Sequence, residues 1–187
     1  MNENFEQEAL TPTSSKWVLV LDVDGVLTDG TFLYDSTGKS HKRFGSEDSD
    51  ALQELSRFVE IEFATADWRG IEISKARIER DMGYPLSLVP AKTRLRWIRE
   101  RWEIENVIYM GDSFMDAEIL KACFFGIAPN NASPLAKLHA DFVTHANGGG
   151  GAVAEACFKI AEILNLSIPC FPSTDRTLYL GITNVQD

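Results

Sequence analysis

The chain has 187 residues, of which 44% are hydrophobic and 25% charged, and its formal net charge is −10. This length and composition are typical of one globular domain that buries most of its apolar surface in a single core. The negative charge makes nucleic acids and anionic membranes poor partners, and no apolar run reaches the length of a transmembrane helix. Three cysteines without metal-binding or pairing spacing, and an acidic N-terminus unlike a signal peptide, indicate a reduced, cytoplasmic protein.

Composition along the chain divides it into three segments. Residues 1–15 are polar and predict a flexible leader, residues 16–166 predict the folded domain, and residues 167–187 form a C-terminal tail or arm. The tail contains two prolines and then an apolar-alternating piece from Thr177 to Ile182. That pattern leaves three interpretations open: a final strand, an arm that lies on a neighbouring subunit, or a disordered end.

The first predicted element is a strand over roughly residues 17–23, within the segment VLVLDVDGVLTDG. Its continuous run of Val and Leu is typical of a strand buried on both faces of a parallel sheet. The run delivers Asp22 and Asp24 to the carboxyl end of the strand, which is where ligands bind in such sheets. Two adjacent carboxylates repel unless a cation or a proton lies between them, and a hard cation with oxygen ligands such as Mg²⁺ meets that need. The simpler alternative is an acidic surface turn after a core strand.

A hairpin and then a regular alternation of helices and strands follow. Residues 31–44 predict two β-rich arms around Ser36-Thr37-Gly38. Helices are then predicted over 48–57, 71–81, 92–102, 114–122 and 134–139, with a last one ending near 164, and strands over 59–65, 85–89, 106–110, 124–127 and 141–144. This alternation predicts an α/β fold, a doubly wound (Rossmann-like) parallel sheet with helices on both faces and a β-hairpin flap.

Three later segments place further polar residues at strand ends or helix starts. IEFATAD ends a strand at Thr65, VPAK puts Lys92 where a helix begins, and VIYMGDSFMD follows a strand with Asp112 and Asp116. Together with DVDGVLTDG, this order of Asp-x-Asp, Thr, Lys and Gly-Asp-x-x-x-Asp resembles the haloacid dehalogenase-like phosphohydrolase superfamily. The resemblance runs from about Trp17 to Leu164, which is nearly the whole chain.

The resemblance implies a catalytic role for each of four residues. Asp22 would be the nucleophile that forms an aspartyl-phosphate, and Asp24 the general acid and then the base. Thr65 would hydrogen-bond a phosphoryl oxygen, and Lys92 would neutralise charge on the phosphate and the nucleophile. The acid at Asp24 also favours phosphoryl transfer over carbon–halogen cleavage, which needs no acid two residues beyond the nucleophile.

The same resemblance implies a Mg²⁺ cofactor. The ion would be held by the Asp22 carboxylate, the Asp24 backbone carbonyl and Asp112, with Ser113 and Asp116 as supporting residues. Asp116, one helical turn beyond Asp112, would hold Lys92 or a metal-bound water in place. The alternative is that Asp116 is an acid favoured at a helix N-terminus, and that Asp112 caps the same helix.

Neither of the first two connections leaves room for a cap domain. The connection after Asp24 holds only the hairpin, and the one between Thr65 and Lys92 holds one helix and one strand. This layout resembles the capless subfamily of phosphatases that act on octulosonate 8-phosphate and on nonulosonate (sialic acid) phosphates. In that subfamily a homotetramer covers each site, so the resemblance implies a homotetramer packed through residues 31–44. The alternative for the hairpin is an ordinary extension of a sheet edge.

The chain departs from that subfamily at three positions where related chains carry arginine. They hold Glu47, Asp67 and Ala154 here. Arginine is the usual side chain for a carboxylate, so these changes place an identical keto-acid substrate in doubt. Lys42, Arg43 and Arg69 could compensate, although solvated surface charges are the simpler interpretation of all three.

These features predict a Mg²⁺-dependent phosphomonoesterase. Its substrate would be a small cytosolic sugar phosphate or sugar-acid phosphate of the octulosonate or nonulosonate type, in lipopolysaccharide or sialic acid biosynthesis. Two other functions remain open: a phosphotransferase or mutase that passes the phosphoryl group to a sugar, and a non-catalytic partner of a sugar nucleotidyltransferase.

Overall fold

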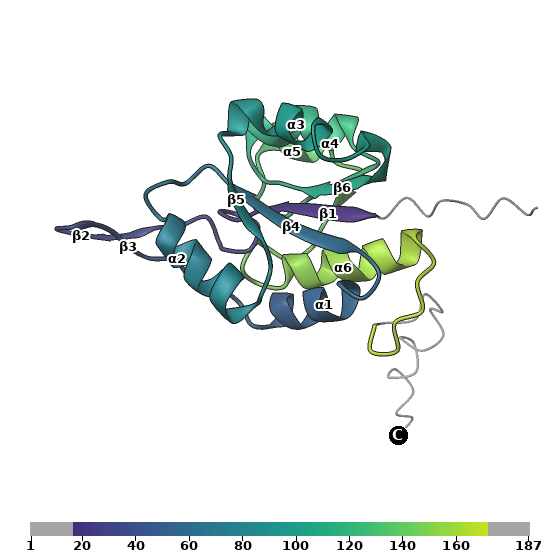
Figure 1. Cartoon of the computed structure of the whole chain (residues 1–187), viewed down its shortest axis with the longest axis horizontal. Coiled ribbons are helices and arrows are strands. Elements are labelled where there is room, and N and C mark those ends of the chain that lie inside the picture. The colour runs from purple at the N-terminus through teal and green to yellow at the C-terminus, as the bar shows by residue number, and fades with distance from the viewer. Residues whose placement is uncertain (1–16, 172–187) are drawn as a thin grey trace, which may run out of the picture.

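The computed structural model describes residues 17–171 and shows a sheet between two layers of helices (Figure 1). Six strands form the sheet in the order β5-β4-β1-β6-β7-β8, and every neighbouring pair is parallel. The strands are β1 (Val18–Asp22), β4 (Glu60–Thr65), β5 (Leu86–Leu88), β6 (Val107–Met110), β7 (Phe125–Ala128) and β8 (Phe142–Val143). The predicted doubly wound parallel sheet is confirmed.

The helices divide into two groups, one on each face of the sheet (Figure 1). One face is covered by α1 (Glu47–Leu55), α6 (Ala152–Ile163) and the helix formed by α2 (Ile71–Lys75) with a π-helical segment η1 (Ala76–Asp81). The other is covered by α3 (Ala91–Arg99), α4 (Ala117–Ala122) and α5 (Pro134–His139). Two short 3-10 turns, η2 (Ile104–Asn106) and η3 (Phe114–Asp116), precede β6 and α4.

Strand β1 lies at the centre of the sheet, and all five of its residues are buried. Leu19 and Leu21 pack into the core beneath α1 and α6, while Val18 and Val20 pack into the core beneath α3 and α4. The alternation of side chains along a strand explains why a run without polar residues is needed here, because both faces are covered. The strand therefore fixes Asp22 at the middle of one sheet edge.

The predicted hairpin is present as β2 (Leu33–Asp35) and β3 (Gly38–His41), an antiparallel pair that extends away from the body of the domain (Figure 1). Asp35 stabilises its turn, since its Oδ1 accepts hydrogen bonds from the backbone N–H and the hydroxyl of Thr37. Leu33 and Tyr34 are more than half exposed. Within residues 17–171 neither the connection after β1 nor the one between β4 and α3 contains a cap domain, as predicted.

The predicted helices and strands all occur, with small shifts at their ends. The helix predicted over residues 71–81 is continuous but changes to π-helical geometry at Ala76. None of the helices in this part of the chain is long and apolar enough to span a bilayer. The leader predicted over residues 1–15 and the alternating piece from Thr177 to Ile182 lie outside the described residues.

Candidate active site

The candidate site lies where the carboxyl ends of three central strands meet. Strand β1 pairs with β4 and β6 in a register that aligns Leu21 with Met110 and Asp22 with Ala64. Asp22 ends β1, Thr65 ends β4, and Asp112 follows β6 by two residues. The three sequence motifs therefore converge at one edge of the sheet, as predicted.

A group of three carboxylates occupies this edge. One carboxylate oxygen from each of Asp22, Asp112 and Asp116 lies within 4.8 Å of the other two. Burial, with the neighbouring charges of Asp22 and Asp116, raises the pKa of Asp112 to about 7. Burial also raises the pKa of Asp22, and the charge of Arg94 opposes that effect.

The chemistry of this group fits a hard divalent cation. Carboxylate oxygens are the ligands that Mg²⁺ prefers, and a cation between them removes the repulsion that raises the pKa of Asp112. Asp22 and Asp112, both in the predicted ligand set, are brought together. Mg²⁺ is the cofactor that this donor set accommodates.

Asp116 is held by a buried hydrogen-bond network rather than by Lys92. Its Oδ1 accepts a hydrogen bond of 2.6 Å from the Tyr109 hydroxyl and one of 3.3 Å from Arg94. Its Oδ2 accepts a 2.9 Å hydrogen bond from the backbone N–H of Ser113, whose hydroxyl in turn caps η3. The partners of Asp116 are therefore Tyr109, Arg94 and Ser113, and the supporting role of Asp116 and Ser113 toward a metal stays a prediction.

The cation beside the nucleophile is Arg94, and the placement predicted for Lys92 is wrong in this structure. Arg94 Nη1 lies 3.3 Å from Asp22 Oδ2, and the Arg94 side chain is only 2% exposed. Lys92 begins α3 as expected, but it is exposed and no ion pair within residues 17–171 joins it to Asp22. The two positions are separated by about 200° around a helix, because each residue turns it by about 100°.

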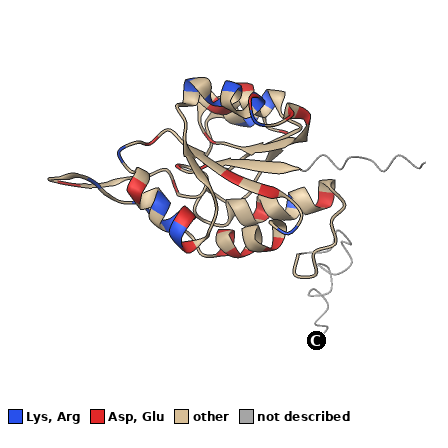
Figure 2. Cartoon of the chain, viewed as in Figure 1, with Lys and Arg blue, Asp and Glu red and all other residues tan. Residues whose placement is uncertain are grey.

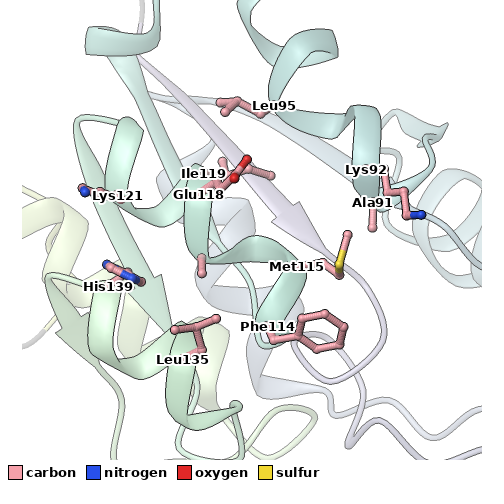
Figure 3. A pocket seen from close by; sticks show the side chains of 11 residues that line it. Ala91, Lys92, Leu95, Phe114, Met115, Glu118, Ile119, Lys121, Leu135 and His139 are labelled. Carbon is pink, nitrogen blue, oxygen red and sulfur yellow. The ribbon is translucent and has the colours of Figure 1, made fainter.

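The sequence contains a signal for the burial of Arg94. Arg94 precedes Ile98 by four residues, so both lie on one face of α3, and both are buried. An arginine in the apolar stripe of a helix indicates a buried partner of opposite charge. Lys92 instead lines a separate hollow of about 520 Å³ between α3, α4 and α5, together with Phe114, Met115 and His139 (Figure 3).

Asp24 lies in a different environment, in the turn after β1. Its Oδ2 accepts hydrogen bonds from the Thr65 hydroxyl at 3.4 Å and from the Lys42 ammonium at 3.0 Å. Burial raises the pKa of Asp24, and the hydrogen bond and charge of Lys42 oppose this only in part. Asp22 and Asp24 therefore sit beside different cations, Arg94 and Lys42.

Lys42 is not the solvated surface charge that the sequence favoured. Its side chain is fully buried, and its ammonium lies 2.7 Å from Asp24 Oδ1, 2.8 Å from Asp67 Oδ2 and 2.9 Å from the Ser74 hydroxyl. The fold-back of the hairpin explains this position, because it returns residue 42 to the carboxyl edge of the sheet. Arg69, by contrast, is exposed and stacks 4.4 Å from the Trp68 ring, as expected for a surface charge.

A glycine run closes the other side of the loop after β1. Gly148 leaves no space for a side chain, since a Cβ there would lie 2.0 Å from the carbonyl oxygen of Gly25. Asn131 joins the two loops, donating to the Gly25 carbonyl at 2.9 Å and accepting from the Gly148 N–H at 2.6 Å.

Asp48, buried in α1, accepts a 3.0 Å hydrogen bond from the N–H of Ala154 at the start of α6.

The charge distribution places basic residues close to this edge without making a continuous basic face (Figure 2). Helix α3 carries Lys92, Arg94, Arg96 and Arg99, of which only Arg94 is buried. Helix α1 carries acidic residues in its first turn and no basic residue in its last. Helices α1 and α3 thus carry charges of opposite sign, and Arg94 is the basic side chain of α3 that reaches Asp22.

Comparison with known proteins agrees with this fold. Residues 96–156 match the family model of haloacid dehalogenase-like hydrolases. The chain is 30% identical over 158 residues to the 3-deoxy-D-manno-octulosonate 8-phosphate phosphatase KdsC of Salmonella typhi, covering 79% of this chain and 80% of that protein. The KdsC protein of Escherichia coli K12 is also 30% identical, over 75% of this chain and 76% of its own length.

Solved structures of similar proteins give the same result. The octulosonate phosphatase of Moraxella catarrhalis, solved with magnesium, phosphate and 3-deoxy-D-manno-octulosonate (KDO), aligns with a TM-score of 0.65 and 26% identity over 81% of this chain and 90% of that one. The cobalt-bound enzyme of Haemophilus influenzae aligns with a TM-score of 0.69 and 25% identity over the same shares.

The chain belongs to the haloacid dehalogenase-like hydrolases, within the group that contains the KdsC phosphatases. It is therefore an enzyme of the phosphatase class.

Proposed function

We propose that the protein is a Mg²⁺-dependent phosphomonoesterase that releases phosphate from a small sugar phosphate or sugar-acid phosphate. The observation that carries this proposal is the pair Asp22 and Asp24, held beside different cations at the same sheet edge. One carboxylate can then remain charged for attack while the other exchanges a proton, which is the division of roles that phosphate-ester hydrolysis needs.

In this mechanism Asp22 attacks phosphorus in line with the leaving oxygen and forms an aspartyl-phosphate. Asp24 donates a proton to the leaving sugar oxygen and then accepts one from the water that hydrolyses the intermediate. The raised pKa of Asp24 supports the first of these steps, because it favours the protonated form.

Charge on the phosphoryl group is balanced by the residues around Asp22. Asp22, Asp112 and the Asp24 backbone carbonyl would hold Mg²⁺, which would supply a Lewis acid for the phosphoryl oxygens. Arg94 takes the role that the sequence assigned to Lys92: it orients Asp22 and offsets negative charge. Thr65 turns its hydroxyl from Asp24 to a phosphoryl oxygen when substrate binds.

We further propose that the protein works in the cytoplasm as a homo-oligomer, with a tetramer as the expected form. The protruding hairpin supports this, because Leu33 and Tyr34 expose apolar area that a second copy would cover. The named relatives act on octulosonate 8-phosphate, and that similarity supports a phosphorylated sugar or sugar derivative as the substrate.

The test is phosphate release from p-nitrophenyl phosphate and from a panel of sugar phosphates at fixed Mg²⁺. Asp22→Asn keeps the side-chain shape but removes the nucleophile, and we expect turnover to fall by about 10⁴-fold or more. Beryllium fluoride with Mg²⁺ should inhibit the parent by occupying the phosphoryl position on Asp22. Activity of Asp22→Asn within tenfold of the parent would falsify the covalent mechanism. A product phosphorylated on an added sugar, without phosphate release, would indicate a phosphotransferase instead.

A further inference from the structure

A charge-balanced cluster lies directly beside Asp24. We call it the Lys39–Asp67 cluster: it contains Lys39, Lys42, Asp24 and Asp67. Asp67 Oδ2 lies 2.7 Å from the Lys39 ammonium and 2.8 Å from that of Lys42, and Lys42 also lies 2.7 Å from Asp24. With Asp24 ionised, two ammonium groups and two carboxylates leave a formal charge of zero. When Asp24 carries the proton that it donates, Lys39 and Lys42 both remain in contact with Asp67.

The cluster is enclosed by the protein rather than spread on its surface. The side chain of Lys42 is fully buried, that of Lys39 is 5% exposed and that of Asp67 is 13% exposed. Burial works to raise the pKa of Asp67, but hydrogen bonds from Lys39 and Lys42 outweigh it, and the pKa lies below its ordinary value. Asp67 therefore remains an anion and forms ion pairs with both lysines.

Local packing fixes this arrangement. The backbone N–H of Gly70 donates to Asp67 Oδ1 at 3.1 Å, and the N–H of Asp67 donates to the Thr65 hydroxyl at 3.0 Å. A Cβ on Gly70 would lie 2.2 Å from Asp67 Oδ2 and 2.8 Å from both lysine side chains. The Lys39 ammonium also lies 3.3 Å from the centre of the Phe32 ring. Neither lysine can turn to a ligand without breaking several of these contacts.

The position of the cluster determines which part of a substrate meets it, and this step rests on the proposed function. A general acid must contact the oxygen of the leaving group, so the sugar leaves the phosphorus on the Asp24 side. Lys42 contacts Asp24 directly, Asp67 contacts Lys42, and Lys39 contacts Asp67. A carboxylate on the sugar would find its two nearest buried cations already paired, and Asp67 would repel it.

We propose that the site selects phosphorylated sugars with an uncharged sugar body over phosphorylated sugar acids, and that Asp67 is the residue that sets this selectivity. Arg69 does not supply a free buried cation for a sugar carboxylate, because it is exposed and stacked on Trp68. An exposed cation interacts with a ligand carboxylate weakly through water.

A matched pair of substrates tests the proposal. Glucitol 6-phosphate and 6-phosphogluconate share a six-carbon chain and differ at the end opposite the phosphate, where one has a hydroxymethyl group and the other a carboxylate. We expect the parent to have a kcat/KM about tenfold or more higher for the neutral compound, the effect of one unfavourably placed charge. Equal or higher efficiency on 6-phosphogluconate would overturn the proposal.

Two variants move the charge of the cluster in opposite directions. Asp67→Asn leaves one positive charge unpaired, and we expect the acid-to-neutral ratio of kcat/KM to rise about tenfold, mainly through a lower KM for the acid. Lys39→Gln leaves the cluster negative and should lower the same ratio. Asp50→Asn, an equal charge change at an exposed position of α1, serves as the matched control and should leave the ratio unchanged.

Hydrolysis of p-nitrophenyl phosphate separates failure of this inference from failure of the proposed function. If the parent with Mg²⁺ does not hydrolyse it, the proposed function fails. If the parent hydrolyses it but Asp67→Asn and Lys39→Gln leave the acid-to-neutral ratio at the parental value, only the selectivity proposal fails. Should Asp67→Asn not fold, as judged by its thermal transition, Lys39→Gln decides the question alone.

Discussion

The Arg94 guanidinium lies 3.3 Å from Asp22 Oδ2 and 3.3 Å from Asp116 Oδ1. One buried cation thus joins the proposed nucleophile to a second carboxylate of the candidate metal site. The Tyr109 hydroxyl completes the connection, accepting from Arg94 at 2.9 Å and donating to Asp116 at 2.6 Å. Arg94 is therefore positioned to orient Asp22 and also to hold charge beside it.

Replacing Arg94 should affect catalysis and stability more than replacing Lys92. We expect Arg94→Met to lower kcat/KM about 100-fold or more, because charge stabilisation beside the phosphoryl group is lost. It should also reduce the free energy of unfolding by about 3–5 kcal/mol, since Asp22 and Asp116 lose their buried counter-charge. Lys92→Met is the matched control on the same helix, and Arg94→Lys tests whether charge alone is enough. Urea unfolding and steady-state kinetics measure the two effects, and a greater loss in Lys92→Met would return the role to Lys92.

Removing Asp112 should weaken metal binding. We expect Asp112→Asn to lower Mg²⁺ affinity at least about tenfold, with part of the rate recovered at high Mg²⁺. Titration calorimetry with Mg²⁺ alone measures the affinity without reference to activity, and Asp50→Asn again serves as the control. The parent should lose activity in excess chelator, and Ca²⁺ should inhibit because it takes more ligands at longer distances. Full activity in chelator would refute the metal assignment.

Asp48 should contribute to stability through its hydrogen bond to the start of α6. We expect Asp48→Ala to cost about 1–3 kcal/mol in the free energy of unfolding, because the buried N–H of Ala154 loses its acceptor. Asp48→Asn keeps an acceptor oxygen and should cost less, and the exposed Asp50→Ala should change stability little. Urea denaturation at neutral pH gives all three values, and equal costs for Asp48→Ala and Asp50→Ala would contradict the assignment.

The stability that Asp48 contributes should fall as the pH rises. Burial raises the pKa of Asp48 above its ordinary value of 3.8, so the folded protein binds the Asp48 proton more tightly than the unfolded chain does. The stability that Asp48 contributes is then fully present below that unfolded-state value and declines as pH rises through the folded pKa. Asp48→Asn does not titrate, so its stability relative to the parent should improve as the pH rises from about 3 to 6.

The hairpin should carry the contact between subunits. We expect multi-angle light scattering to give an oligomer for the parent at micromolar concentration, and Leu33→Asp or Tyr34→Asp to shift it toward the monomer. Leu138→Asp is the matched control, because Leu138 is 74% exposed on α5, away from the hairpin. A parent that is monomeric at this concentration, or a Leu138→Asp that dissociates equally, would count against the hairpin interface.

Local patterns in the sequence were sufficient to predict the sheet and the convergence of three motifs. Continuous apolar runs end at Asp22 and Thr65 and just before Asp112, and parallel strands bring their carboxyl ends together regardless of side-chain detail. The positions of the strands, and the meeting of Asp22, Thr65 and Asp112 at one edge of the sheet, could therefore be predicted from local patterns, because each segment contains its own apolar run and polar end.

The identity of the cations was not predictable in the same way. Whether Lys92 or Arg94 reaches Asp22 depends on how α3 is rotated against the sheet, which is set by packing of Ile98 and its neighbours. The position of Lys42 depends on how far the hairpin folds back, which no local pattern specifies. Both are long-range consequences of packing. The sequence signals the burial of Arg94, through its place in the apolar stripe of α3, but not its partner, and Lys42 resembles an ordinary surface charge.

The contact of the glycine run with the loop after β1 bears on how the protein becomes active during its synthesis. Asn131 bonds to Gly25 across 106 residues of chain, and the N–H of Gly149 donates to the carbonyl of Val26 at 3.1 Å. Asp22 and Asp24 therefore leave the ribosome long before the segments that hold their loop. A nascent chain whose residues 148–151 are still inside the ribosome has its nucleophile but no fixed site around it, and it should not hydrolyse phosphate esters until that segment has emerged.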